Sequence, residues 1–323
     1  MQDGTAPRDL RYRFQWNAPI LFSQHDPEVV YHTSNYVHRT RDGGQSWETI
    51  SPDLTTDNAE QQDLPGGPIQ HDHTGVEVYN TVFALAESPG DASELWAGSD
   101  DGRIHVTRDG GASWSDVTPD ALPTGATVNS IDLSAQQPGR ATVAAYRYRD
   151  NDFRPYVFQT EDWGSSWRSL ATGRNGIPED HPVRVVREDP DRAGLLYAGT
   201  EFGMFVSFDD GDHWQSLQLN LPVTPITDLV VHEQDLVVAT QGRSFWILDD
   251  LTPLHEIAAG IAAGAAHLFT PRPVVRAVGR GFFGGPPSGV VARFWLPDDL
   301  EEGSEIVLEA GRRRAPDGQT KGL

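Results

Sequence analysis

The sequence contains no cysteine, one lysine (Lys321) and only two methionines. The absence of cysteine excludes disulfide bridges and thiolate chemistry, and it leaves the redox compartment open. No apolar run approaches the roughly 20 residues of a membrane-spanning helix, and the N-terminal stretch MQDGTAPRDLRYRF lacks the apolar core of a signal peptide. We therefore expect no membrane insertion, and either a cytosolic protein or a mature or truncated form of a longer one.

Positive charge is scarce. The chain has 25 Lys and Arg against 47 Asp and Glu, a formal net charge of -22, and the acids are spread along the whole sequence. This balance argues against nucleic acid and anionic membrane surfaces as partners. Arginine carries nearly all the positive charge. That skew fits a GC-rich genome or adaptation to high salt, and the sequence leaves both explanations open.

Long amphipathic helical patterns are also rare, whereas 32 Gly, 23 Pro and 9 Trp favour short strands joined by turns. Residues 195–214 (LLYAGTEFGMFVSFDDGDHW) show the basic unit, with two strand-like runs separated by a tight turn and followed by a second turn. The second turn follows the pattern (S/T)-x-D-x-G-x-x-W. It occurs four times, at residues 40–47, 107–114, 160–167 and 207–214. The motif aspartates are 67, 53 and 47 residues apart, and such periods in all-β segments predict the blades of a β-propeller.

Each fixed position of the motif has a mechanical reason. The aspartate accepts backbone N–H groups inside the turn, the glycine supplies positive φ, and the tryptophan buries a large ring between neighbouring sheets. Because the motif joins the two outer strands of a blade, we expect it at the periphery, away from any axial site. The residues predicted to be structural on this ground are Asp42, Trp47, Asp109, Trp114, Asp162, Trp167, Asp209 and Trp214.

The predicted fold is an all-β propeller of four-stranded antiparallel blades, within residues 10–252. About five blades are visible, at residues 17–52, 76–118, 127–172, 182–220 and 223–252. The fifth has the strand pattern without the Asp turn, as terminal repeats often do. Residues 253–275 are expected to form a linker, and residues 276–323 the start of a small Ig-like β-sandwich.

The other class of turn, between the second and third strands of each blade, is expected to open on one mouth. The polar loop 51–75 feeds the same region and is longer than a plain connection. Asp100 or Asp101 and Glu201 occupy equivalent turns two blades apart, and paired carboxylates are what glycoside hydrolysis requires. Turn-forming acids in an acidic protein are the alternative. The further candidates for substrate binding are Asp101, Arg147, Asp152, Arg154, Phe202, Arg243, His71 and His73.

Other chemistry has little support. His71-Asp72-His73 offers ligands that zinc accepts, but spacing fixes no third ligand, so neither a metal nor a cofactor is expected. Ser244 lacks the G-x-S-x-G context of a serine nucleophile. Arg147, Arg149 and Arg154 are suited to binding a carboxylate, or else they pair with Asp150 and Asp152.

The four motifs resemble the Asp-box, or bacterial neuraminidase repeat. The wider runs GGPIQHDHTGVEVYNT, LLYAGTEFGMFVSFDDGDHWQSLQLNLP and ATQGRSFWILDD resemble the bacterial sortilin-like "glycosyl hydrolase" proteins with this repeat. Those proteins usually have seven or more blades, are much longer and are exported. The resemblance implies an extracellular or periplasmic protein, and a chain that is the later part of a longer one. Its partners would then include missing blades of the parent chain or a second copy.

Family 74 xyloglucanases are more distantly similar. Their catalytic acids lie in a turn of the form (S/T)-D-x-G-G after a Y-A strand. Ala198–Gly203 (AGTEFG) and Ala97–Gly102 (AGSDDG) match that placement, which implies roles for Glu201 and Asp100. Glutamate replaces aspartate in one turn and the second glycine is missing in both. The arginine triad of true sialidases is not matched, and Phe153-Arg154-Pro155 echoes their F-R-I-P segment only in part.

Three functions follow from this reading. The first is a glycoside hydrolase that acts on a polysaccharide or oligosaccharide through Glu201 and Asp100. The second is a non-catalytic, sortilin-like propeller that binds a peptide or a glycan at the same mouth. The third is a scaffold for protein partners, and the fold alone does not choose among them.

Overall fold

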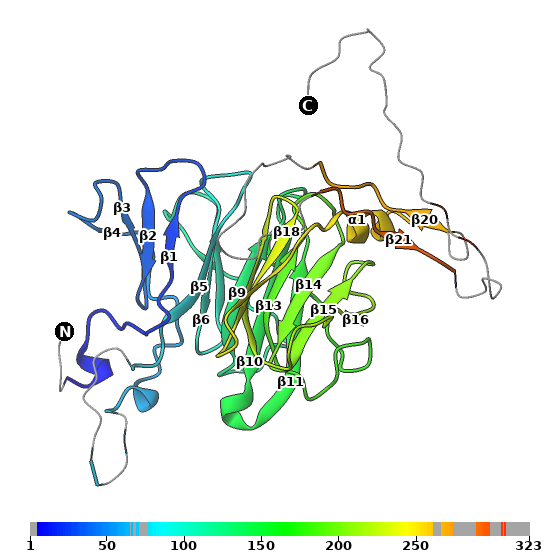
Figure 1. Cartoon of the computed structure of the whole chain (residues 1–323). Coiled ribbons are helices and arrows are strands. Elements are labelled where there is room, and N and C mark those ends of the chain that lie inside the picture. Colours follow the sequence, from blue (N-terminus) through cyan, green and yellow to red (C-terminus); the bar gives the residue numbers. More distant parts are fainter. Residues whose placement is uncertain are drawn as a thin grey trace. The chain divides into compact units, whose positions relative to one another are not determined.

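The computed structural model describes residues 5–64, 66, 69–70, 77–260, 266–273, 289–297, 305 and 307. The chain divides into two units, residues 1–258 and 259–323, which are described separately. Apart from short helical turns, the first unit is built of antiparallel sheets (Figure 1). Within the described part of the chain, no helix is both long and apolar enough to cross a membrane.

Five sheets follow one another along the first unit, and in each the strands pair in chain order. The first sheet contains β1 (Ile20–Phe22), β2 (Val30–Thr33), β3 (Val37–Thr40) and β4 (Glu48–Thr49). The second contains β5 (Val82–Glu87), β6 (Leu95–Ser99), β7 (Ile104–Thr107) and β8 (Ser115–Asp116). The third contains β9 (Thr127–Leu133), β10 (Ala141–Arg147), β11 (Asp152–Thr160) and β12 (Arg168–Ser169).

The fourth sheet contains β13 (Val183–Glu188), β14 (Leu196–Thr200), β15 (Gly203–Ser207) and β16 (Gln215–Ser216). The fifth has three strands, β17 (Ile226–His232), β18 (Asp235–Thr240) and β19 (Phe245–Leu248). Three short 3-10 turns, η1 (Pro7–Asp9), η2 (Ala59–Gln61) and η3 (Tyr148–Asp150), and one α-helix, α1 (Thr252–Ala258), complete the described elements of this unit. The predicted all-β propeller of four-stranded antiparallel sheets is confirmed.

Neighbouring sheets stack face to face because the strands are apolar on both sides. In the fourth sheet, Val186 and Ala198 pack towards the third sheet, whereas Val185 and Tyr197 pack towards the fifth. The first strands of successive sheets also lie against one another, β5 beside β9, β9 beside β13 and β13 beside β17. The first strand of each of these sheets is therefore the innermost, as the propeller prediction requires.

Two glycines lie where a second strand closely approaches the first strand of the next sheet. A Cβ atom on Gly98 in β6 would lie 2.3 Å from Cγ1 of Val128, and one on Gly199 in β14 would lie 2.6 Å from Cγ2 of Ile226. Real Cβ atoms do not approach other atoms so closely. The repeated Ala-Gly-Ser/Thr sequence at these strands thus has a packing reason, independent of any chemistry in the turn that follows.

In the second unit, β20 (His267–Leu268) pairs with β21 (Phe294–Trp295). The Ig-like module expected over residues 276–323 lies largely outside the described residues. The helix α1 occupies the start of the stretch expected to be a linker.

Candidate functional site

The Asp turns form a repeated network of hydrogen bonds. In the first sheet, Asp42 Oδ1 accepts the backbone N–H of Ser46 at 2.9 Å, and Oδ2 accepts the Ser46 hydroxyl at 2.6 Å. Thr40 donates its hydroxyl to Asp42 and accepts the N–H of Gly44. These bonds, led by those from Ser46, lower the pKa of Asp42 to about 2. Asp109, Asp162 and Asp209 make equivalent bonds in the next three sheets.

The motif tryptophans tie each sheet to the one before it. The indole Nε1 atoms of Trp114, Trp167 and Trp214 donate, each at 2.8 Å, to the backbone carbonyls of Ile50, Val117 and Leu170, respectively. Each acceptor follows the fourth strand of the preceding sheet. Trp47, in the first sheet, makes no such bond among the residues described and is 47% exposed.

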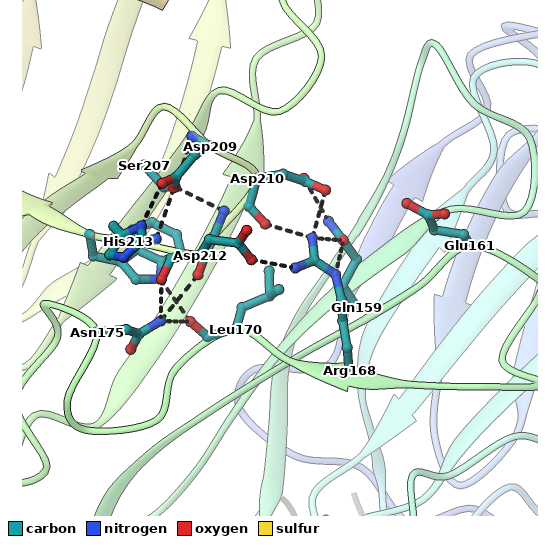
Figure 2. A network of polar contacts seen from close by, with 12 residues as sticks. Gln159, Glu161, Arg168, Leu170, Asn175, Ser207, Asp209, Asp210, Asp212 and His213 are labelled. Atoms are coloured by element: carbon teal, nitrogen blue, oxygen red, sulfur yellow. Dashed lines mark hydrogen bonds and ion pairs between the residues drawn. The ribbon is translucent and has the colours of Figure 1, made fainter.

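Figure 2 shows the fourth Asp turn beside the third sheet. The guanidinium of Arg168, on β12, donates to Gln159 Oε1, to Asp210 and to Asp212. Asn175 Nδ2 donates to the carbonyl of Leu170 at 2.8 Å. These hydrogen bonds link the turn and the third sheet into one network. The carboxylates of Asp210 and Asp212 are paired with Arg168 in this network.

The other class of turn lies between the second and third strands of each sheet. Asp100 and Asp101 join β6 to β7, the segment 147–152 joins β10 to β11, Glu201 and Phe202 join β14 to β15, and residues 241–244 join β18 to β19. Because all these sheets have the same strand order, the turns lie at the same end of their sheets, where the first strands begin.

A cavity of about 540 Å³ lies at this end, beside the starts of β5 and β9. It is lined by residues, most of them polar, from five stretches of the chain. The lining residues are Thr56, Asn58, Gln61, Tyr79, Asp101, Thr124, Gly125, Thr127, Tyr146, Arg147, Arg149 and Asp150. Two of the predicted binding residues, Asp101 and Arg147, belong to this set.

The guanidinium groups of the cavity differ in their surroundings. Arg147 Nε lies 3.1 Å from Asp150 Oδ2 in an ion pair. Arg149 is exposed and forms no ion pair with a carboxylate of the described residues, and it lies 5.9 Å from the ring of Tyr148. Burial, with Asp100 and Asp101 nearby, raises the pKa of Tyr79, so its hydroxyl stays protonated. The cavity therefore offers neutral hydrogen-bonding groups, the ion-paired Arg147 and Asp150, and the charged side chains of Arg149 and Asp101.

Asp101 has its oxygens occupied by neighbours. Oδ2 accepts the N–H and the hydroxyl of Thr56, at 2.8 and 2.7 Å, and the amide of Asn80 at 2.6 Å. Oδ1 accepts the hydroxyl of Ser99. The carboxylate thus holds the loop after the first sheet against the second sheet, and it shapes the wall of the cavity.

Asp100 is buried behind this wall. Its carboxylate accepts the N–H and the hydroxyl of Thr81, both at 2.8 Å. Burial raises the pKa of Asp100 from 3.8 to about 7, although these two bonds oppose the shift. Asp100 is not among the residues that line the cavity.

The raised pKa of Asp100 predicts a pH effect on stability. A group whose pKa is higher in the folded state stabilises the fold below its unfolded pKa, and this stabilisation is lost as pH rises through the folded pKa. Wild type should therefore lose more stability than Asp100→Asn between pH 4 and 7, by on the order of 2 kcal/mol, since relaxation reduces the full effect of burial. Urea unfolding at several pH values measures this. Asp132, whose pKa is raised to about 6, titrates in both proteins. Parallel curves would contradict the prediction.

Glu201 has a different environment. Its Oε1 accepts a hydrogen bond from Arg184 Nε at 2.5 Å, and the Arg184 guanidinium lies 5.3 Å from the Tyr146 ring and 5.6 Å from the Tyr148 ring. Glu201 does not line the cavity either, although Tyr146 does. The two predicted catalytic acids therefore have different hydrogen-bond partners: Thr81 donates to Asp100, and Arg184 donates to Glu201.

Asp152 and Arg154 line a second, shallow depression of about 510 Å³, together with Phe153 and Glu179. Arg154 donates to both Asp152 oxygens, at 2.9 and 2.7 Å, and these bonds hold the pKa of Asp152 well below its usual range. Arg154 and Asp152 form an ion pair. Such pairing was the alternative to binding a carboxylate ligand in the sequence analysis.

The other predicted residues lie apart from the cavity. Phe202 is half exposed and its ring centroid lies 4.6 Å from that of His181. Arg243 is exposed in the turn between β18 and β19. His71 and His73 lie outside the described residues. Among the residues that the structure describes, no three His, Asp or Glu side chains are grouped to hold a metal ion.

Sequence reasoning missed several lining residues, notably Asn58, Gln61 and Tyr79. The length of the loop 51–75 indicated the region. The predicted binding residues of this loop, His71 and His73, lie in its second half, whereas the lining residues lie in its first half. Tyr79 lies three residues before β5, the innermost strand of its sheet. A position just before an inner strand was the available signal.

The sequence matches no protein-family model and no curated protein. Among solved structures, the chain is similar to the GH74 xyloglucanase of Xanthomonas campestris, with 15% identity over 72% of this chain and a TM-score of 0.53. Others are a GH74 enzyme of Niastella koreensis (14% identity, 70% of this chain, TM-score 0.49) and the β-propeller domain of Cps50 (Swd1) from Myceliophteria thermophila (12% identity, 73% of this chain, TM-score 0.46).

The matched region spans 36% of each GH74 chain and 65% of the Cps50 domain. At such identities the likeness to the Xanthomonas structure concerns the fold alone. The chain is a β-propeller.

Proposed function

We propose that the protein is a carbohydrate-binding β-propeller and that its ligand occupies the cavity beside the starts of β5 and β9. The observation that supports this most is the lining, in which hydroxyl and amide groups surround about 540 Å³ of space. Asn58, Gln61, Thr124 and Thr127 provide neutral donors and acceptors, which match the hydroxyl groups of a sugar. Arg149 adds a cation that forms no ion pair with a carboxylate in the part of the chain that the structure describes.

Binding fits the acids of the mouth better than catalysis does. Asp101 accepts four hydrogen bonds from Thr56, Asn80 and Ser99, and Glu201 is held by Arg184. Asp101, engaged in this way, shapes the cavity without having to move a proton, and Glu201 is not among the lining residues. A binding site needs only the polar groups that face the cavity, and these are present.

Replacing cavity residues should weaken binding. A glycan array identifies ligands, and titration calorimetry then compares wild type with Gln61→Ala and Arg149→Ala. We expect each change to weaken binding about 5-fold to 100-fold, since a lost hydrogen bond to a neutral or charged group costs about 1–3 kcal/mol. Arg154→Ala, in the shallow depression, is the matched control and should leave affinity unchanged. Equal affinity in all four proteins would contradict the proposal, as would a peptide ligand in place of a glycan.

Glycoside hydrolysis is the second candidate, and the raised pKa of Asp100 favours it. A carboxyl group that is still protonated near neutral pH is suited to act as a general acid, with Glu201 as the second carboxylate. Xyloglucan is the first substrate to try, because the similar Xanthomonas enzyme is a xyloglucanase. Release of reducing sugar that is lost in both Asp100→Asn and Glu201→Gln would support hydrolysis. If no polysaccharide that binds on the array releases reducing sugar, binding without hydrolysis is the remaining function.

An extracellular or periplasmic location belongs to the same proposal, since polysaccharide ligands are accessible there. Fractionation of cells that produce the natural protein tests it. Recovery in the cytosolic fraction alone would contradict this location without bearing on the cavity.

A further inference from the structure

The cavity beside the starts of β5 and β9 offers a ligand more hydrogen-bond donors than acceptors. Among its lining residues, Arg147 and Arg149 can only donate, and the hydroxyl of Tyr79 stays protonated. Neither Tyr79 nor Arg149 makes a side-chain hydrogen bond within the part of the chain that the structure describes. These donors come from two neighbouring sheets, since Tyr79 precedes β5 and both arginines belong to the connection between β10 and β11.

The two acids of the lining are already engaged. Asp101 accepts four hydrogen bonds, which is about the number that the lone pairs of a carboxylate can accept. Asp150 Oδ2 lies 3.1 Å from Arg147 Nε in an ion pair. The formal charges of these acids and of the two arginines cancel, so the balance of free donors and acceptors, and not the net charge, selects the ligand.

Gly125 lies where several of these groups meet. A Cβ atom on this glycine would lie 3.6 Å from Asp150 Oδ2, 3.7 Å from Tyr79 Oη and 3.9 Å from Arg147 Nε. The place of the missing side chain is therefore bordered by a carboxylate, a hydroxyl and a guanidinium. Although Arg147 Nε is close to Asp150, it makes no hydrogen bond, so the ion pair leaves the donors of this guanidinium unused.

We propose that the carbohydrate bound in this cavity carries a carboxylate, as a uronic acid does, and that Tyr79, Arg147 and Arg149 bind this carboxylate. The inference rests on the proposed carbohydrate binding and adds the class of sugar. A carboxylate accepts hydrogen bonds and donates none, so it matches the free donors, and guanidinium groups bind it through paired N–H groups. The ring hydroxyls of the same sugar can donate to Asp150. Because the net charge of -22 repels anions at long range, these short contacts carry the selectivity.

Ligands that differ only in charge test the proposal. The probes are oligogalacturonates and glucuronate-containing oligosaccharides, each printed on a glycan array as the free acid and as the methyl ester, beside neutral and sulfated neutral oligosaccharides. Esterification removes the negative charge and keeps the ring hydroxyls. We expect wild type to bind the best acid about 10-fold or more tightly than its ester, because hydrogen bonds to charged groups are the stronger ones.

Variants of the full chain then locate the carboxylate by titration calorimetry with that acid and its ester. Arg149→Gln should weaken binding of the acid about 10-fold and affect the ester much less, since it removes a charged donor. Asp150→Asn should strengthen binding of the acid several-fold, because it removes a negative charge beside Arg147. A gain in affinity cannot arise from misfolding. Arg174→Gln, at an exposed arginine outside the lining, is the control and should change neither affinity.

The outcomes separate this inference from the proposed function. Equal binding of acids and esters overturns the inference and leaves carbohydrate binding intact, and so does a preference for sulfated sugars over uronates. If the acids bind tightly but Arg149→Gln and Asp150→Asn change nothing, the carboxylate lies elsewhere and the inference is wrong. An array on which no sugar binds overturns both the proposed function and this inference.

Discussion

Replacing Trp214 by alanine is expected to lower the free energy of unfolding by about 3–5 kcal/mol. The ring is only 4% exposed and belongs to the core cluster between the third and fourth sheets. Its Nε1 donates to the carbonyl of Leu170 at 2.8 Å, so the substitution also removes one of the two side-chain hydrogen bonds that this carbonyl accepts, the other coming from Asn175 Nδ2. Urea unfolding followed by circular dichroism measures the loss.

Trp47→Ala is the matched control, because it removes the same residue of the same motif. Trp47 is half exposed and has no preceding sheet to pack against in the described chain, so the expected loss is about 1 kcal/mol or less. Similar losses at the two positions would show that the turn itself, and not the contact between sheets, carries the stability.

The fold could be predicted because its signal is local and repeated. Each Asp turn is an eight-residue sequence in which Asp, Gly and Trp make contacts that the same sequence dictates each time, as in residues 107–114. The fifth sheet shows the limit of this signal. It lacks the Asp turn, and it has three strands among the residues that the structure describes. Its strands were predicted from apolar alternation, but alternation does not say whether a face is covered, and the exposure of Phe245 and Ile247 appears only in the structure.

The candidate site could be predicted only in part. Strand order places the turns with Asp101 and Arg147 at one end of the sheets, and both residues line the cavity. Which loop residues join them depends on contacts between distant segments. The bonds from Thr56 to Asp101 bring the first half of the loop 51–75 to the cavity, and no local pattern announces them.

The side chains that surround each of the two predicted catalytic acids could likewise not be predicted from the sequence. Asp100 and Glu201 occupy equivalent turns, yet one is buried against Thr81 and the other is paired with Arg184. Arg184 lies at the start of β13, and its guanidinium is placed by the rings of Tyr146 and Tyr148 from the preceding sheet. Equivalent positions in a repeat share a backbone, whereas their chemistry is set by neighbouring sheets that differ.

The second large effect is expected at Arg140, where methionine should destabilise the protein by about 3–5 kcal/mol. Arg140 is buried directly before β10 of the third sheet, and its guanidinium lies between Glu161, Glu188 and Asp210. Glu188 is itself buried, and its Oε1 is 3.1 Å from Arg140 Nη2. Removing the cation leaves a buried carboxylate without its counter-charge, which is far more costly than losing an exposed pair. Arg103→Met, which breaks the exposed pair with Asp116, should cost less than about 1 kcal/mol.

A second substitution separates the charge effect from lost packing. In the Arg140→Met background, Glu188→Gln removes the uncompensated charge, while the side-chain oxygen of glutamine still accepts the N–H of Gly194, as Glu188 does. If the unpaired charge causes the loss, the double variant should regain a large part of the stability in urea unfolding, because a buried pair replaced by neutral groups is often tolerated. If Glu188→Gln instead lowers stability further in that background, the guanidinium acts mainly through packing and through its contacts with Glu161 and Asp210. The same substitution in wild type should be destabilising, since it leaves Arg140 with one fewer carboxylate, and this change of sign between the two backgrounds is the result that the buried ion network requires.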